Sequence, residues 1–239
     1  MKVAILAGGY GSRIAEYTNK IPKPMIKVGK KPIIEHLINF YSKFGCKDFF
    51  IAGGYKYNII KKFFSKNKDT KNLNIKVINT GLKSLTGKRI FKLKKFLKNE
   101  ENFFLTYGDG ISNINLKKLV SFHKKKKSII TLSAVRPPAR FGELKIKGSK
   151  VINFKEKPQM QNGWINGGFF VVNKKFFKFI NNKNVMLERE PLETVCSSKK
   201  MFAYKHKDFW KCIDTKRDLD QFENLIKSKK FNLKSFERN

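Results

Sequence analysis

A glycine-rich stretch followed by two cations is the first part of this chain whose residue types could do chemistry. Residues 6–13 read LAGGYGSR, and residues 22–24 read PKP. Glycines let the backbone approach a ligand closely and leave its N–H groups pointing at an anion, most simply a polyphosphate. Arg13 can make a forked contact to phosphate oxygens, and Lys23 can act as a point charge. The spacing matches neither the P-loop nor the dinucleotide-binding fingerprint, so it predicts a phosphate-binding loop of another kind.

Two aspartates stand where strands are expected to end. Asp109 lies between two glycines after an apolar run, and Asp214 comes directly before an amphipathic segment. Ligands of open α/β sheets bind at the carboxyl ends of the strands. Two carboxylates that meet there can hold Mg²⁺, a hard cation that takes oxygen ligands and shares substrate phosphates. A turn for Asp109 and a helix N-cap for Asp214 are the structural alternatives, and the residues alone leave both open.

Two further polar runs gain meaning only beside these residues. Residues 156–158 read EKP, and residues 166–169 read NGGF. Taken alone, a Glu-Lys pair is most often a solvated strand end. The three histidines lie outside every motif, and the three cysteines are scattered, without the paired spacing of metal ligands. We therefore assign no histidine to catalysis and expect neither a disulfide framework nor a zinc site, a pattern typical of a reducing cytoplasm.

Strands and helices must position these groups, and their places are predicted from the sequence pattern. Apolar segments alternate with amphipathic ones, which predicts an α/β protein with a largely parallel sheet. Residues 53–54 are glycines that also follow a strand, but they lack the cations of the first run, so we interpret them as a tight turn. The expected strands are 3–7, 48–52, 74–79, 102–107, 128–135, 164–172, 201–206 and 210–213, with a hairpin over 141–146 and 151–155. The expected helices are 32–44, 58–65, 88–97, 115–126, 174–180, 191–197 and 215–228.

Composition bounds the class of protein. The chain has 239 residues, of which 41% are hydrophobic, so we expect one core and a single domain over residues 1–239. The net charge is +35, carried mainly by lysines spread along nearly every expected helix and loop. Such a spread is typical of codon drift in an A- and T-rich genome and not of one nucleic-acid-binding face. The apolar run at residues 3–7 is too short for a signal peptide or a membrane span.

The glycine run and the Pro-Lys-Pro that follows it resemble the signature of the sugar-1-phosphate nucleotidyltransferases, and the resemblance covers almost the whole chain. It implies the nucleotide-diphospho-sugar transferase fold. That fold is α/β and Rossmann-like, with a doubly wound, mixed, mostly parallel sheet, helices on both faces and an inserted β-rich sugar-binding part. It also implies that residues 1–135 mainly bind the nucleotide and residues 136–214 mainly bind the sugar phosphate. Residues 215–239 would form a closing helix and a tail.

The same resemblance implies a role for each motif residue. Catalysis would rest on Arg13, Lys23 and Asp109, and Mg²⁺ would be held as cofactor by Asp109 and Asp214. The residues expected to bind the sugar phosphate are Lys23, Glu156, Lys157, Asn166 and Gly167. The residues expected to bind the nucleotide are Leu6, Ala7, Gly8, Gly9, Gly11, Ser12, Arg13, Ser84, Arg89 and Gly108.

Residues 84–89, which read SLTGKR, resemble the cytidylyl-transferring branch of that family, as do residues 140–142 and 209–210. The resemblance implies transfer of CMP from CTP to α-D-glucose 1-phosphate, giving CDP-glucose and pyrophosphate for polysaccharide synthesis such as that of O-antigen. It further implies a cytoplasmic homo-oligomer with neither nucleic-acid nor membrane partners. Uridylyl or thymidylyl transfer is the closest alternative. A non-catalytic protein that binds a nucleotide sugar or a nucleic acid is the remote one.

Overall fold

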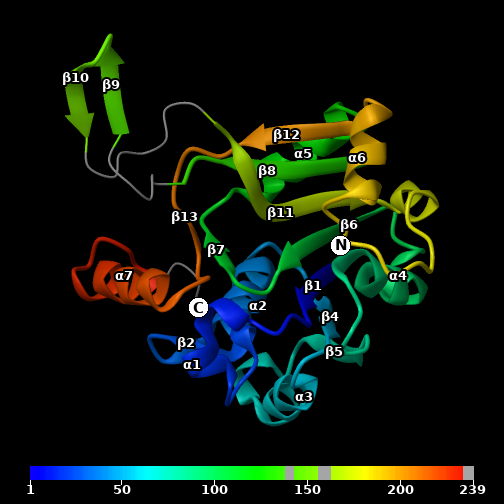
Figure 1. The fold of residues 1–239 in the computed structure, drawn as a ribbon. Helices are drawn as coiled ribbons and strands as arrows, with labels where there is room; N and C mark the ends of the chain where they lie inside the picture. The colour runs from blue at the N-terminus through cyan, green and yellow to red at the C-terminus, as the bar shows by residue number, and fades with distance from the viewer. Residues whose placement is uncertain (138–142, 156–162, 234–239) are drawn as a thin grey trace.

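The computed structural model describes residues 1–137, 143–155 and 163–233, and its centre is one seven-stranded sheet in the order β12-β8-β11-β6-β1-β4-β5 (Figure 1). The strands pair in parallel except β11, which runs antiparallel to both β6 and β8. The sheet is therefore mixed and mostly parallel, which confirms the expected fold class. Its strands are β1 (Val3–Ala7), β4 (Asp48–Gly53), β5 (Asn74–Asn79), β6 (Asn102–Tyr107), β8 (Ile130–Val135), β11 (Ile165–Asn173) and β12 (Met201–Lys205).

Helices cover both faces of this sheet (Figure 1) because its buried strands alternate apolar side chains between two cores. In β1, Val3 and Ile5 face one core, and Ala4 and Leu6 face the other. The first core includes side chains of α2, α3, α5 and α7, and the second those of α4, the 3₁₀ turn η4 and α6. The helices are α1 (Ala15–Thr18), α2 (Ile33–Lys43), α3 (Tyr57–Lys66), α4 (Thr86–Leu97), α5 (Leu116–Lys125), α6 (Glu190–Ser197) and α7 (Lys216–Lys227).

A two-stranded hairpin stands away from the sheet (Figure 1). It consists of β9 (Glu143–Lys147) and β10 (Lys150–Lys155), which confirms the expected hairpin, although the expected start at 141–142 lies outside the described residues. Ile146 pairs with Val151, and Leu144 pairs with Phe154. These four apolar side chains are all exposed, by 49–60%. The hairpin thus presents an uncovered apolar face to solvent.

Seven short elements of the described residues were not expected from the sequence: β2 (Lys27–Val28), β3 (Lys31–Pro32), β7 (Gly110–Ser112), α1 and the 3₁₀ turns η1 (Ser12–Ile14), η2 (Lys23–Met25) and η3 (Lys68–Thr70). Each has four residues or fewer, so none is long enough to show a hydrophobic period. The expected helix at 174–180 is the 3₁₀ turn η4 (Lys174–Lys178), and the expected strand at 210–213 is β13 (Trp210–Cys212). Among the described residues, no helix combines the length and the apolarity that crossing a membrane requires.

Candidate active site

A short ladder between β7 and β13 brings the two predicted metal ligands together. The two strands pair antiparallel. The N–H of Ile213 donates to the carbonyl of Asp109 at 3.0 Å, which extends the pairing past the strand ends. Asp109 lies between β6 and β7, and Asp214 lies between β13 and α7. The carboxyl edge of the sheet therefore carries both aspartates, as the sequence predicts for a ligand site.

The helix after Asp214 is capped by another residue. Thr215 is the N-cap of α7, and its side chain forms a reciprocal capping box with Asp218. Burial raises the pKa of Asp218, but hydrogen bonds from Thr215 and the charge of Lys211 outweigh burial and bring this pKa below its usual value. Asp214 contributes only its backbone N–H, which donates to Asp218 Oδ2 at 3.2 Å. The N-cap alternative for Asp214 is therefore wrong, and capping does not occupy its carboxylate.

Lys23 lies between the two carboxylates. Its Nζ is 2.6 Å from Asp109 Oδ2 and also donates to Asp214 Oδ1. Arg13 binds the other oxygen of Asp214, with Nη1 2.7 Å from Oδ2. The side chain of Lys23 is 11% exposed and that of Arg13 is 68% exposed. Lys23 is thus held inside the cluster, whereas Arg13 lies at its solvent side, where an incoming anion meets it first.

The charge of Lys23 follows from its surroundings. Burial alone would lower the pKa of this ammonium group, but the charge of Asp109 and the hydrogen bonds to Asp109 and Asp214 raise the pKa above its usual value. Lys23 is therefore charged throughout the physiological pH range. Two cations and two anions then balance in the cluster. A polyphosphate that entered alone would leave excess negative charge, so its entry favours an accompanying cation.

The donor atoms of the cluster fit a divalent cation. Asp109, Asp214 and Cys212 each place one donor atom within 4.8 Å of the other two. The carboxylate oxygens are the hard ligands that Mg²⁺ prefers. Burial and the charge of Asp109 raise the pKa of the Cys212 thiol, which is therefore neutral and a poor ligand for a hard cation. The Lys23 ammonium group donates to one oxygen of each aspartate, so it competes with such a cation for the two carboxylates.

The three glycines of the first run differ in why their positions suit a glycine. A Cβ at Gly8 would lie 2.2 Å from Arg89 Nη1, so Gly8 is needed for packing against Arg89. A Cβ at Gly9 would meet nothing within 4 Å, and this glycine is exposed. Gly11 has φ 69°, and a Cβ there would lie 2.7 Å from Thr18 Cγ2. Of the three, Gly9 is therefore the one whose backbone is open to a ligand.

Arg89 is buried and binds three loops at once. Its guanidinium group donates to the carbonyls of Gly8 at 2.8 Å, Gly53 at 3.2 Å, Gly81 at 2.9 Å and Leu82 at 3.3 Å, and to Thr80 Oγ1 at 2.6 Å. Burial lowers the pKa of this guanidinium group below its usual value. The acceptors lie at or just after the ends of β1, β4 and β5. Arg89 thus holds the expected nucleotide loops in place from behind, and its direct contact with a nucleotide stays a proposal.

The second glycine pair lies against the first run. A Cβ at Gly54 would be 2.6 Å from the Gly8 carbonyl oxygen, and the N–H of Tyr55 donates to that same oxygen at 3.2 Å. The sequence predicted a tight turn at residues 53–54 and gave it no role in the site. This turn nevertheless supports the loop that carries Gly9, because Gly54 and Tyr55 pack on Gly8, the residue before Gly9. Sequence reasoning missed this support because close packing between two loops leaves no local pattern.

The remaining residues predicted to bind the nucleotide lie at strand ends and in loops. Leu6 and Ala7 are buried at the end of β1. The N–H of Gly108 donates to the Leu6 carbonyl at 2.9 Å, which continues the β1–β6 pairing. Ser12 is exposed in the turn that ends in Arg13 and Ile14. The hydroxyl of Ser84 donates to the Thr80 carbonyl, so in this structure it stabilises its own loop.

On the sugar side, the structure describes only part of the predicted set. Glu156 and Lys157 lie outside the described residues. The exposed Asn166 uses its Oδ1 to accept from the N–H of Gly168 at 2.9 Å. The carbonyl of Gly167 accepts from Trp210 Nε1 at 2.7 Å. The β11 segment that carries Asn166 is therefore fastened to β13, next to the aspartate cluster.

Sequence reasoning missed a second cluster of polar side chains, formed by Thr86, Tyr107 and Glu188. Glu188 accepts one hydrogen bond from each of the other two side chains, both at 2.6 Å. Tyr107 lies two residues before Asp109, which was the available signal for it. Glu188 lies in the stretch 181–190, which carries no recognised motif, so only the tertiary structure brings it to Tyr107.

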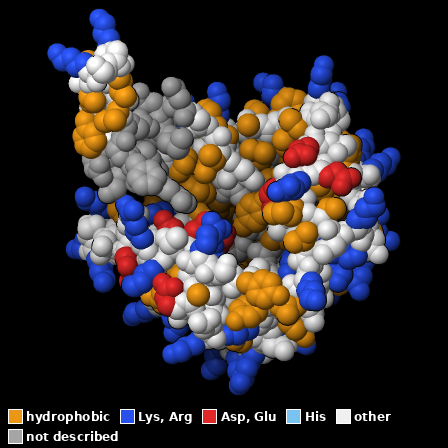
Figure 2. All heavy atoms as spheres, viewed as in Figure 1, with side chains coloured by type: hydrophobic (Ala, Val, Ile, Leu, Met, Phe, Trp, Pro, Cys, Tyr) orange, Lys and Arg blue, Asp and Glu red, His pale blue; other side chains and the backbone are white. Residues whose placement is uncertain are grey.

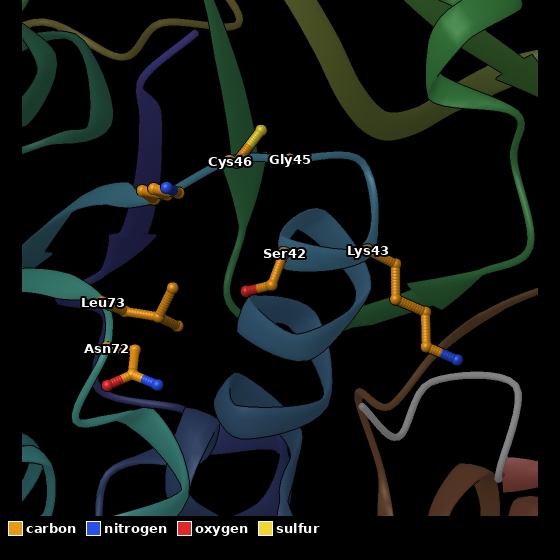
Figure 3. A pocket seen from close by; sticks show the side chains of 7 residues that line it. Ser42, Lys43, Gly45, Cys46, Asn72 and Leu73 are labelled. Carbon is orange, nitrogen blue, oxygen red and sulfur yellow. The ribbon is translucent and has the colours of Figure 1, made fainter. Parts of the chain in front are cut away.

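One face of the molecule is hollowed. Figure 2 shows this hollow near the middle of the face, with acidic and basic side chains beside it. Figure 3 shows a different pocket of about 580 Å³. It lies at the end of α2 and at the amino ends of β4 and β5, and its lining residues are Ser42, Lys43, Gly45, Cys46, Lys47, Asn72 and Leu73. That pocket lies at the opposite edge from the aspartate cluster and contains none of the predicted site residues.

Known proteins resemble the chain over nearly its full length. The family model named Nucleotidyl transferase matches residues 2–234. Glucose-1-phosphate cytidylyltransferase of Salmonella typhimurium is 37% identical over 257 residues, which cover 99% of this chain and 100% of the relative. The probable glucose-1-phosphate cytidylyltransferase of Bacillus subtilis is 36% identical over 239 residues, 92% of this chain and 93% of the relative.

Solved structures share the fold. The crystal structure of a putative glucose-1-phosphate thymidylyltransferase from Bacillus anthracis matches with a TM-score of 0.72 at 20% identity, and the match covers 99% of this chain and 98% of that one. At this identity the likeness shows the fold alone. It agrees with the mixed, mostly parallel sheet described above.

Proposed function

The chain belongs to the nucleotidyl transferase family, and we propose that it transfers CMP from CTP to α-D-glucose 1-phosphate, giving CDP-glucose and pyrophosphate. The observation that carries the proposal is the cluster of Lys23, Arg13, Asp109 and Asp214 at the carboxyl edge of the sheet. This cluster provides the cations and carboxylates that a reaction between two phosphates requires. The full-length similarity to glucose-1-phosphate cytidylyltransferases supports the choice of base and sugar.

The reaction joins two anions, and this decides what the protein must contribute. An oxygen of glucose 1-phosphate attacks the α-phosphorus of CTP and forms a new P–O bond. The bond from that phosphorus to the bridging oxygen breaks, and pyrophosphate leaves with the electron pair. The attacking phosphate has a second pKa of about 6, so it is mostly ionised at pH 7 and needs no general base. Positioning and charge stabilisation therefore carry the rate.

The exposures within the cluster support a division of roles. The solvent-facing Arg13 binds the β- and γ-phosphates and the departing pyrophosphate. Lys23 turns from Asp109 to the α-phosphate, where negative charge develops. Asp109 and Asp214 hold Mg²⁺, which neutralises phosphate charge when bound. Lys157, outside the described residues, is proposed to bind the phosphate of glucose 1-phosphate.

The two substrates would occupy different parts of one sheet. The nucleotide is proposed to lie over residues 1–135, at the loops after β1, β4 and β5 that Arg89 fastens together. The hexose is proposed to lie against residues 136–214, near Asn166 and Gly167 on β11. Residues 215–239 are proposed as a closing helix and tail. Because β11 pairs with both β6 and β8, the two parts share a continuous sheet, which supports treating 1–239 as one domain.

Three further properties are part of the proposal. The protein is proposed to be a cytoplasmic homo-oligomer that has neither nucleic-acid nor membrane partners. The uncovered apolar face of the β9–β10 hairpin supports self-association, because burying apolar surface in a second copy would stabilise a contact between two strongly basic chains. Light scattering of the purified protein measures this directly, and a monomer at all concentrations would refute the oligomer.

The experiment that tests the reaction is pyrophosphate release with Mg²⁺ and glucose 1-phosphate across CTP, UTP, dTTP, ATP and GTP. We expect strong release with CTP and weak release with the other four. Release with UTP or dTTP in place of CTP would keep the chemistry and refute the choice of base. No release with any nucleotide, repeated with other sugar 1-phosphates, would refute the catalytic function.

A further inference from the structure

The cluster around Glu188 lies beside the proposed active site and has no part in the roles given above. Tyr107, the last residue of β6, donates its hydroxyl to Glu188 Oε1 at 2.6 Å. Thr86, the first residue of α4, donates its hydroxyl to Glu188 Oε2 at 2.6 Å. One carboxylate therefore joins three segments: the end of β6, the start of α4 and the 181–189 loop.

Glu188 makes no ion pair with any described residue, although the chain is strongly basic. The sequence has 53 basic and 18 acidic side chains. Both of its donors are neutral hydroxyls, because burial and the charge of Glu188 raise the pKa of Tyr107 above its usual value. Each carboxylate oxygen can accept more than the one hydrogen bond it receives here.

Anchoring of the 181–189 loop does not explain this carboxylate. Other groups already tie the loop to residues 83–88 with six hydrogen bonds. Four are Gly87 N–H to the Val185 carbonyl at 3.0 Å, Leu85 N–H to Asn184 Oδ1 at 2.8 Å, Asn184 Nδ2 to the Lys83 carbonyl at 3.1 Å and Leu187 N–H to Thr86 Oγ1 at 2.8 Å. The other two run from Lys88 Nζ to the carbonyl and the Oδ1 of Asn182. The loop is thus held without the carboxylate, and the charge at Glu188 remains available for a ligand.

Tyr107 connects this carboxylate to the strand proposed to bind the sugar. Its ring lies against the β11 backbone, since a Cβ at Gly168 would be 2.6 Å from Tyr107 Cδ2. A hydrogen bond from the Asn166 side chain lowers the pKa of the same hydroxyl, against the larger effects of burial and Glu188. Glu188, Tyr107 and Asn166 therefore form one polar surface. A fixed carboxylate on such a surface is suited to accept hydrogen bonds from ligand hydroxyls.

We propose that the Glu188 carboxylate accepts hydrogen bonds from hydroxyl groups of a bound sugar ring and so selects hydroxylated over deoxygenated substrates. Thr86 and Tyr107 are positioning residues that fix the two oxygens. The inference rests on the proposed function, whose reaction contains two such rings, the hexose of glucose 1-phosphate and the ribose of CTP. Both offer the same chemistry, and Glu188 stands between the segments proposed to bind them.

The test compares discrimination between substrates in the wild type, Glu188→Gln and Glu188→Ala. The assay is pyrophosphate release, with kcat/KM measured for glucose 1-phosphate against its 2-, 3-, 4- and 6-deoxy analogues, and for CTP against 2′-deoxy-CTP. A hydrogen bond to a charged group corresponds to about a 10- to 100-fold preference. We expect both variants to lose a preference of this size for one hydroxyl while the preferences for the others stay unchanged.

A preference lost in the glucose 1-phosphate series identifies the hexose as the ligand of Glu188, and one lost in the CTP series identifies the ribose. Either result supports the proposal. Asn184→Ala is the matched control, because it removes two of the loop's anchoring bonds and keeps the carboxylate. We expect its discrimination to equal that of the wild type. Unchanged discrimination in both Glu188 variants would overturn the proposal, and so would an equal loss in Asn184→Ala. A wild type without turnover on any nucleotide and sugar phosphate would instead overturn the proposed function and this inference with it.

Discussion

Replacing Lys23 by Met should turn the aspartate cluster into a metal site that binds without a nucleotide. The ammonium group of Lys23 makes two charge-assisted hydrogen bonds, one to Asp109 and one to Asp214. Bonds of this kind contribute about 1.5–3 kcal/mol each. A cation that displaces Lys23 from both therefore gives up about 3–6 kcal/mol, which corresponds to about 10²–10⁴-fold in affinity. Methionine has a similar length and no charge, so it removes this competition.

The assay is binding of Mn²⁺ to the protein without nucleotide, followed by the loss of the electron paramagnetic resonance signal of free Mn²⁺. We expect Lys23→Met to bind Mn²⁺ at least ~10²-fold more tightly than the wild type, the low end of the range above. Turnover should fall by about 10²–10³-fold, because the α-phosphate loses its cation. Metal at 100 times its dissociation constant should stabilise the variant by about 2.7 kcal/mol. For a domain of this size that raises Tm by roughly 5–11 °C.

A matched control exists in the same chain. Lys31 also bridges two carboxylates, with Nζ 3.1 Å from Glu35 and 2.9 Å from Asp69, and neither belongs to the cluster. Lys31→Met should leave Mn²⁺ affinity and turnover unchanged. Equal Mn²⁺ affinity in the wild type and Lys23→Met would refute the competition between ammonium and metal. It would also mean that Lys23 does not occupy the metal-binding oxygens in solution.

Two other predictions follow from buried groups. Replacing Arg89 by Met removes the five hydrogen bonds by which its guanidinium group ties the loops at the ends of β1, β4 and β5 together, so the free energy of unfolding in urea should fall by about 2–5 kcal/mol and the KM for the nucleotide should rise; an unchanged urea midpoint and KM would contradict this. Burial lowers the pKa of His123 to about 4, whereas the unfolded chain binds this proton near pH 6.5. Stability should therefore fall as the pH drops from about 6.5 to 4, by up to about 1.4 kcal/mol per pH unit, and His123→Gln should flatten that slope in urea titrations at each pH. A slope that persists in the variant would assign it to other groups.

The sequence by itself determined the features that depend on neighbours along the chain. The alternation of apolar and amphipathic segments predicted the strands and helices of the main sheet, because periods of 2 and 3.6 residues are local properties. The glycine run after β1 and the aspartate after β6 were predicted for the same reason, since a strand end and its turn are read from a few consecutive residues. The strand β7 was missed because its three residues are too few to show a period.

Only the tertiary structure decided which distant residues meet. Lys23 reaches Asp109 across 86 positions of sequence and Asp214 across 191, and these contacts depend on the strand order and on the β7–β13 ladder. Glu188 reaches Tyr107 across 81 positions, through a loop whose residues carry no motif. No local rule contains such pairings, because hydrogen bonds between strands and packing between loops are set by the whole sheet. The sequence therefore determined which groups could do the chemistry, and the fold decided that Lys23 bridges Asp109 and Asp214, the proposed metal ligands, and that Glu188 contacts Tyr107.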